Sequence, residues 1–162
     1  MKYLTYSASQ TRRIGEFFAK NIKRIMPSKE RALVIGLKGG LGGGKTTFLQ
    51  GFAKGLEIKE RVLSPTFILM RKFSVPQSKN EKIKKLSSLK FKYLYHIDCY
   101  RILKPKEILE LGFKKIISGP QNIIAIEWAG RVKKILPQKT LILEFEFINK
   151  NTRRIIVRPI SD

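Results

Sequence analysis

Two nearly continuous apolar runs are the strongest structural signal in the chain. Residues 31–37 and residues 122–128 consist mostly of aliphatic side chains, a composition typical of strands buried on both faces of a sheet. Shorter or alternating apolar segments predict the remaining strands at residues 1–6, 66–73, 91–97, 140–148 and 153–160. The last two are expected to form a hairpin, and the 66–73 and 91–97 strands to pair antiparallel.

Apolar residues at helical spacing separate several of these strands. Ile14, Phe18 and Ile22 recur on one side of a predicted helix that begins near residue 9 and ends before Pro27. Further helices are predicted at residues 45–55, 105–111 and 129–136. Because these helices alternate with strands, the sequence predicts an α/β fold with a mostly parallel central sheet, antiparallel hairpin additions and flanking helices.

The length and composition fit one folded domain. The 162 residues are 43% hydrophobic, which argues against a disordered chain, and residues 1–162 are expected to form a single domain with a basic insertion at about 75–91. Cys99 is the only cysteine, so an intramolecular disulfide is excluded and a reducing compartment is favoured. No apolar run approaches the roughly 20 residues of a membrane span and no signal-peptide pattern is present, so we expect a cytoplasmic protein.

The chain is strongly basic, with a formal net charge of +22. Such a charge attracts polyanions, of which nucleic acid is the most common. The densest basic stretch lies at residues 79–92, but no aromatic RNA-binding motif or zinc knuckle accompanies it, and lysines are scattered along the rest of the chain. Nucleic-acid contact and a compositional bias are therefore both open as interpretations.

A glycine-rich segment between the first buried strand and the second predicted helix matches the phosphate-binding pattern G-x-x-x-x-G-K-[ST]. It reads Gly39-Gly40-Leu41-Gly42-Gly43-Gly44-Lys45-Thr46. Glycines allow the backbone to turn its N–H groups toward an anion, and the N-terminus of the following helix adds positive potential. In this motif Lys45 contacts the β- and γ-phosphates, and the Thr46 hydroxyl is a ligand of Mg²⁺. The sequence therefore predicts a P-loop NTPase-like three-layer fold that binds a nucleotide and Mg²⁺.

Two acidic residues are candidates for the second half of such a site. A P-loop enzyme needs a carboxylate at the end of a neighbouring strand to hold Mg²⁺ or its water. Glu127 lies at the end of the buried 122–128 strand, and Asp98 follows the 91–97 strand. Parallel strands would deliver both to the carboxyl edge of the sheet. The alternative for either residue is an acid at a strand end that is exposed to solvent or paired with one of the many lysines.

Four segments of the chain resemble the signatures of the bacterial TsaE family. They are the run from Gly39 to Phe48, then Ser64-Pro65-Thr66-Phe67, His96-Ile97-Asp98-Cys99-Tyr100-Arg101 and Glu127-Trp128. The resemblance extends from about residue 5 to about residue 160, in the family's order and near its spacing. TsaE proteins are small P-loop ATPases that act in forming N6-threonylcarbamoyladenosine (t6A) at adenosine 37 of tRNA.

The resemblance implies a role for each matching residue. Lys45, Asp98 and Glu127 would be catalytic, with Asp98 near the γ-phosphate or its attacking water. Thr46 and Glu127 would hold the metal. The implied nucleotide contacts are Leu41, Gly42, Gly43, Gly44, Lys45, Thr46, Thr47 and Thr66, the last in a segment expected to sense the nucleotide. Trp128 would face the nucleotide, a partner protein or the core. His96 would hold the loop of the site by a hydrogen bond, in preference to acting as a general base, and Arg101 would pair with an acid or sense phosphate.

Two glycines depart from the family pattern. Family members usually carry an acidic residue where this chain has Gly40, and alanine where it has Gly43. Neither departure removes a phosphate ligand. The missing acid at position 40 is expected to change the contacts that brace the loop or the rate of hydrolysis. The basic insertion is also longer than the hairpin that is usual in the family.

The resemblance implies an ATP-binding, slowly hydrolysing accessory protein with ATP and Mg²⁺ as cofactors. Its partner would be the TsaB–TsaD transferase pair, which it would reset between turnovers without transferring the threonylcarbamoyl group itself. Contact with tRNA would be indirect or weak, and no membrane contact is expected. The alternatives are a small-molecule P-loop kinase and a basic RNA-binding nucleotide switch. A GTPase is disfavoured because Asn149-Lys150-Asn151-Thr152 lacks the aspartate of the guanine-binding pattern Asn-Lys-x-Asp.

Overall fold

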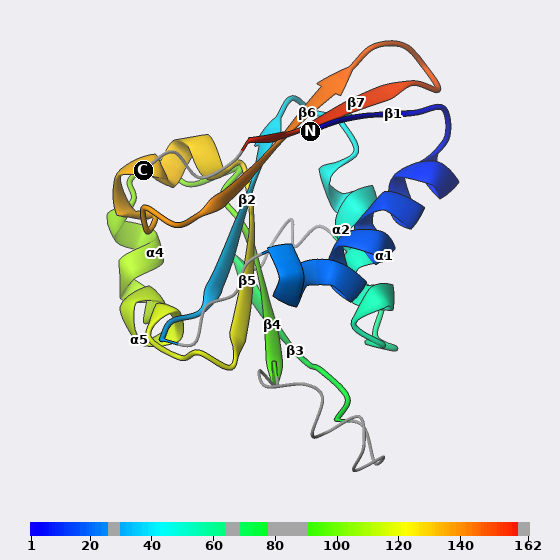
Figure 1. Ribbon diagram of the computed structural model, residues 1–162. Coiled ribbons are helices and arrows are strands. Elements are labelled where there is room, and N and C mark those ends of the chain that lie inside the picture. The colour runs from blue at the N-terminus through cyan, green and yellow to red at the C-terminus, as the bar shows by residue number, and fades with distance from the viewer. Residues whose placement is uncertain (26–29, 64–68, 78–90, 159–162) are drawn as a thin grey trace.

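A mixed sheet of seven strands forms the centre of the molecule in the computed structural model (Figure 1). The structure describes residues 1–25, 30–63, 69–77 and 91–158. In chain order the strands are β1 (Lys2–Thr5), β2 (Leu33–Gly39), β3 (Met70–Ser74), β4 (Tyr93–Asp98), β5 (Asn122–Glu127), β6 (Leu141–Phe147) and β7 (Arg153–Arg158). Across the sheet they lie in the order β1-β7-β6-β2-β5-β4-β3.

Helices cover both faces of this sheet, so the expected three layers are present (Figure 1). One face carries α1 (Ala8–Ile25) and α2 (Lys45–Gly55), which pack against each other. The other carries α4 (Lys106–Glu110), α5 (Phe113–Ile117) and the 3₁₀ helix η1 (Ala129–Ile135). Within the described ranges, no helix combines the length and the apolar character needed to cross a membrane.

The centre of the sheet is parallel and its edges are antiparallel. Strands β6, β2, β5 and β4 are parallel neighbours, whereas β7 pairs antiparallel with β6 and β1, and β3 pairs antiparallel with β4. The predicted α/β fold with antiparallel additions is therefore confirmed. The parallel register brings strand ends together, because Glu127 lies opposite both Leu37 on β2 and Asp98 on β4. This edge of the sheet carries the candidate site.

The structure differs from the predicted elements in a few places. Gly112, with a φ of 79°, follows the C-cap of α4 directly, as expected for a glycine that ends the predicted 105–111 helix, but it also precedes α5, a helix that the sequence does not predict. A helix this short gives too few apolar repeats to be recognised. Residues 129–135 form a 3₁₀ helix that is kinked at Val132 (φ −117°, ψ 17°). The predicted 66–73 strand and the basic insertion at 75–91 fall partly in residues 64–68 and 78–90, which lie outside the described residues.

An apolar core lies on each side of the sheet. Under α1 and α2 the core is aromatic, with Phe48 meeting Phe18 and Phe145 edge to face at centroid distances of 5.7 and 5.6 Å. On the other face Phe113 and Ile126 belong to a second buried cluster beneath the short helices. Because both faces of β2 and β5 are covered, these strands are held firmly, and so are the residues at their ends.

The helices α1 and α2 approach so closely that a glycine on each has no room for a side chain. A Cβ atom on Gly51 would collide with the carbonyl oxygen of Arg12, and one on Gly15 would collide with that of Phe48. Since a clash with backbone cannot be relieved by changing a rotamer, Gly51→Ala is expected to lower the free energy of unfolding by about 2–3 kcal/mol. Chemical denaturation measures this change.

Gly130→Ala is the matched control for this prediction. No described atom lies within 4 Å of a Cβ built on Gly130. The free energy of unfolding should therefore change by less than about 0.5 kcal/mol. Equal losses in the Gly51→Ala and Gly130→Ala variants would contradict the close approach of the two helices.

Candidate functional site

The glycine-rich loop, residues 39–44, connects β2 to α2 at the carboxyl edge of the parallel strands. Gly39, Gly42 and Gly44 have φ values of 136°, 70° and 95°, which residues with a side chain rarely adopt. A Cβ on Gly39 would also collide with the carbonyl oxygen of Phe145 on β6. The glycines therefore permit the tight turn after which α2 begins at Lys45, with its first turn beside the strand ends.

Lys45 is folded back over this loop, with only 5% of the residue exposed. Its Nζ donates hydrogen bonds to the carbonyl oxygens of Gly39 (2.9 Å) and Gly40 (2.7 Å). The same atom lies 4.2 Å from the centre of the Trp128 ring. Burial lowers the pKa of Lys45, and the carboxylates of Glu127 and Asp98 oppose this shift. The lysine is therefore a buried cation placed directly against the loop and near two acids.

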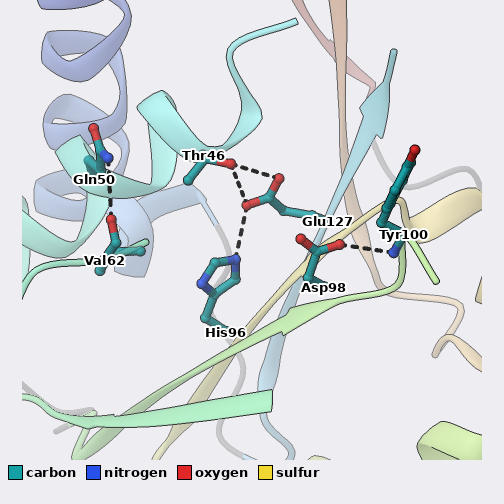
Figure 2. A network of polar contacts seen from close by, with 7 residues as sticks. All are labelled: Thr46, Gln50, Val62, His96, Asp98, Tyr100 and Glu127. Carbon is teal, nitrogen blue, oxygen red and sulfur yellow. Dashed lines mark hydrogen bonds and ion pairs between the residues drawn. The ribbon is translucent and has the colours of Figure 1, made fainter. Parts of the chain in front are cut away.

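The Glu127 carboxylate has hydrogen-bonding partners on α2 and on β4 (Figure 2). Thr46 Oγ1 donates to Glu127 and lies 2.9 Å from Oε1 and 3.0 Å from Oε2. His96 Nε2 lies 2.9 Å from Oε1, and the side chains of His96 and Glu127 are 0% and 3% exposed. His96 therefore makes its hydrogen bond to the carboxylate at the end of β5.

Asp98 lies at the end of β4, next to Glu127 in the parallel register, and is also buried. Its Oδ1 accepts a hydrogen bond from the backbone N–H of Tyr100 (2.9 Å), as Figure 2 shows. The Tyr100 ring packs on that of Trp128 with centroids 5.1 Å apart. Cys99 belongs instead to the core on the other face, where burial raises the pKa of its thiol to about 12. A thiol with that pKa is not a nucleophile at neutral pH.

A cavity of about 1040 Å³ opens at this edge of the sheet. Residues 41–47, Asp98 and Glu127 all line it, so it brings together every predicted site residue that the structure describes. Thr66 is the exception, because it lies outside the described residues. Trp128 and Arg101 also line the cavity, which favours a position facing the ligand over a core position for Trp128.

Two segments that are not predicted from the sequence complete the cavity. One is the β1–α1 connection with the first turn of α1, which contribute Tyr6, Ser7 and Thr11, and the other is the β6–β7 turn, with Lys150 and Asn151. Neither segment carries a recognisable motif. The β6–β7 turn reaches the site because β6 is the parallel neighbour of β2, a pairing that local sequence does not reveal.

The oxygen donors beside the loop suit a small, hard cation. Mg²⁺ prefers oxygen ligands and is usually held by one or two carboxylates together with substrate phosphates and water. Thr46 and Glu127 place a hydroxyl and a carboxylate side by side, and Asp98 adds a second carboxylate on the next strand. These residues therefore fit Mg²⁺ that is bound together with phosphate groups.

The glycines that depart from the family pattern differ in the space around them. Among the described atoms, none lies within 4 Å of a Cβ built on Gly40, so an acidic side chain would fit there. A Cβ on Gly43 would lie 3.1 Å from the Gly40 carbonyl oxygen, so alanine would require a small shift of the loop. Packing therefore does not explain why this chain has glycine at position 40.

Comparison with known proteins identifies the family. Residues 5–156 match the family described as Threonylcarbamoyl adenosine biosynthesis protein TsaE. The tRNA threonylcarbamoyladenosine biosynthesis protein TsaE of Bacillus subtilis is 32% identical over 162 residues, which cover 100% of this chain and 87% of the relative. The same protein of Rickettsia prowazekii is 32% identical over 148 residues, which cover 91% and 87%. The crystal structure of Bacillus subtilis YdiB matches with a TM-score of 0.68 at 26% identity, covering 99% of this chain and 86% of that one. The chain therefore belongs to the TsaE family, which takes part in the biosynthesis of threonylcarbamoyladenosine in tRNA.

Proposed function

We propose that this protein binds ATP and Mg²⁺ in the cavity at the glycine-rich loop and hydrolyses ATP slowly, as an accessory protein of t6A formation. One observation carries the proposal: a buried lysine directly after a glycine-rich loop and two buried carboxylates meet at one cavity. Ligand pockets typically measure about 300–1,000 Å³, and buried charged groups gathered in a cleft are typical of functional sites.

In the proposed hydrolysis, the residues of the loop and of the two strand ends would have different roles. Loop N–H groups and Lys45 would bind the β- and γ-phosphates, with Lys45 exchanging its bonds to loop carbonyls for bonds to phosphate oxygens. Thr46 and Glu127 would hold Mg²⁺, which neutralises charge on the phosphoryl oxygens when bound. Asp98 would orient the water that attacks in line with the leaving phosphate.

The nucleoside would occupy the part of the cavity beyond the loop. Tyr6 and Ser7 from the β1–α1 connection line this part, together with Lys150 and Asn151 from the β6–β7 turn. Arg153, the first residue of β7, joins that turn to the loop. Its Nε donates to the carbonyl oxygen of Gly42 (2.7 Å), and its Nη1 donates to the carbonyl oxygens of Asn149 and Thr152 within the turn. The loop is thus braced by a strand that is distant in sequence.

Arg153→Leu is expected to weaken ADP binding about 10-fold, because the loop loses a charge-assisted hydrogen bond at Gly42. Isothermal titration calorimetry measures the affinity. Arg153→Lys should recover little of it, since an ammonium group cannot make the forked contacts of a guanidinium. Arg158→Leu, at the other end of β7, removes an arginine that pairs with Glu144 and should leave ADP affinity unchanged. Similar losses at both positions would rule out a specific brace.

The partner in this proposal is the TsaB–TsaD transferase pair. Membership of a family that acts in t6A biosynthesis supports this assignment. The pair would raise the rate of ATP hydrolysis, and hydrolysis would reset the complex between turnovers. The protein itself would not transfer the threonylcarbamoyl group. A cytoplasmic location goes with this proposal.

The test is ATP turnover by the purified protein, measured alone and with the TsaB–TsaD pair. We expect slow turnover alone, faster turnover with the pair, and loss of both in the Lys45→Ala variant. Turnover that is equally fast without the pair would refute the dependence on a partner. Tight ATP binding without hydrolysis in either condition would favour the small-molecule kinase.

The high positive charge supports weak contact with tRNA as a second property. The chain carries a formal net charge of +22, and binding driven by such charge weakens steeply as salt rises. We expect tRNA binding by this protein alone to be weak and to disappear at raised salt. Tight binding without nucleotide or partner would instead favour an RNA-binding nucleotide switch.

A further inference from the structure

The imidazole of His96 is buried and has no role in the hydrolysis proposed above. It lies on β4, two residues before Asp98, and therefore on the same face of the strand. No part of the residue is exposed. In the sheet register it stands between Ala125 on β5 and Arg71 on β3. The ring therefore projects from the face of the sheet that carries α1 and α2, where it contacts the Glu127 carboxylate of the candidate site.

The two ring nitrogens of His96 have different surroundings. Nε2 lies 2.9 Å from Oε1 of Glu127, whereas Nδ1 is buried without a hydrogen-bond partner among the described residues. A carboxylate only accepts hydrogen bonds, so Nε2 must carry a proton and donate it. A buried Nδ1 without a partner costs stability, which an apolar residue at this position would avoid. The imidazole is therefore better explained by its effect on Glu127 than by packing.

Thr46 and His96 hold the Glu127 carboxylate from different elements, α2 and β4 (Figure 2). The Thr46 hydroxyl is itself a proposed Mg²⁺ ligand, so its contact with Glu127 is shared with the cation when one binds. The Nε2 of His96 is already committed to the carboxylate. His96 is thus the partner whose only role at Glu127 is to orient it.

We propose that His96 is a positioning residue whose Nε2–H fixes the orientation of the Glu127 carboxylate and thereby sets the affinity of the nucleotide complex for Mg²⁺. This inference rests on the proposed function, because it concerns the cation that accompanies the nucleotide. Removing the hydrogen-bond partner of a carboxylate ligand typically lowers metal affinity by about 10–100-fold.

The first test reads the ring protons directly. His96 is the only histidine in the chain, so labelling with ¹⁵N-histidine gives the imidazole signals of one residue. We expect NMR spectroscopy at neutral pH to show a proton on Nε2. An unprotonated Nε2 would overturn the proposal, since that atom could not then donate a hydrogen bond to Glu127.

The second test measures the affinity for Mn²⁺, used as a probe for Mg²⁺, by electron paramagnetic resonance of the full chain saturated with ADP. His96→Phe keeps a ring and removes the donor, and we expect the Kd for Mn²⁺ to rise about 10–100-fold. Its affinity for ADP in EDTA should stay unchanged. His96→Gln returns an N–H group and should recover most of the Mn²⁺ affinity.

The outcomes separate the role of His96 from the proposed function. Unchanged Mn²⁺ affinity in His96→Phe, no recovery in His96→Gln, or an equal loss of metal-free ADP binding would overturn the role of His96 while leaving the nucleotide site in place. A wild-type protein that binds neither ADP nor ATP would overturn both. If neither variant folds, the ring-proton measurement decides.

Discussion

Lys45→Ala is expected to lower ATP turnover in the presence of the TsaB–TsaD pair by about 10²–10³-fold, the usual cost of removing one preorganised group that stabilises transition-state charge. Lys45 is suited to this role because it is buried, and a charge acts more strongly in a site from which water is excluded. Alanine would also remove a positive charge that interacts with Glu127 and Asp98, so ADP binding should weaken as well.

Lys54→Ala is the matched control on the same helix. The Lys54 side chain is 74% exposed and pairs with Glu16 at 3.2 Å, far from the described cavity lining. Exposed pairs of this kind contribute about 0–1 kcal/mol to stability, and turnover should not change. Comparable losses in the Lys45→Ala and Lys54→Ala variants would show that general positive charge, and not the loop lysine, supports activity.

The environment of Lys45 also predicts a pH dependence. Burial disfavours the ammonium form and lowers the pKa of Lys45, while Glu127 and Asp98 oppose the shift. Phosphate binding uses the protonated form, so ADP affinity measured in EDTA should fall as the pH rises through this lowered pKa. The fall should begin at a lower pH than for an ordinary lysine, and it should be missing in Lys45→Ala.

The sequence was sufficient to predict the loop and both acids because each is encoded locally. The phosphate-binding pattern has fixed spacing, and a buried strand before it and an amphipathic helix after it supply its context. Glu127 and Asp98 follow apolar strands, and parallel strands end at one edge of the sheet, where ligands bind in α/β folds. The register that places Asp98 opposite Glu127 agrees with this expectation.

Contacts between distant segments were not predictable in the same way. The bond from Arg153 to Gly42 joins residues 111 positions apart and depends on how β6 and β7 extend the sheet. The alternating pattern predicts the β6–β7 hairpin that carries Arg153. It does not show that β6 pairs with β2 and so brings the hairpin to the loop. Gly112 shows a limit of local signals, because a glycine with positive φ after an apolar repeat indicates the end of α4 but does not show that a second short helix, α5, begins directly after it.

Glu127→Gln is expected to separate nucleotide binding from hydrolysis. The amide keeps the size of the carboxylate but removes the charge that would hold Mg²⁺, so partner-stimulated turnover should fall by about 10²–10³-fold. ADP binding in EDTA should be retained or become tighter, because one negative charge beside the phosphates is gone. Turnover and calorimetry on the same preparation measure both effects.

The control for this change is Glu146→Gln on β6, where the carboxylate is 43% exposed and pairs with Arg154 at 2.8 Å. Both turnover and ADP affinity should be unchanged there, because the charge is screened by water and lies outside the described cavity lining. Full turnover in Glu127→Gln would exclude Glu127 as the metal-side acid and leave Asp98 as the remaining carboxylate candidate. Loss of metal-free ADP binding in Glu127→Gln would show instead that the carboxylate mainly maintains the loop through Thr46, since that hydrogen bond links β5 to the first turn of α2.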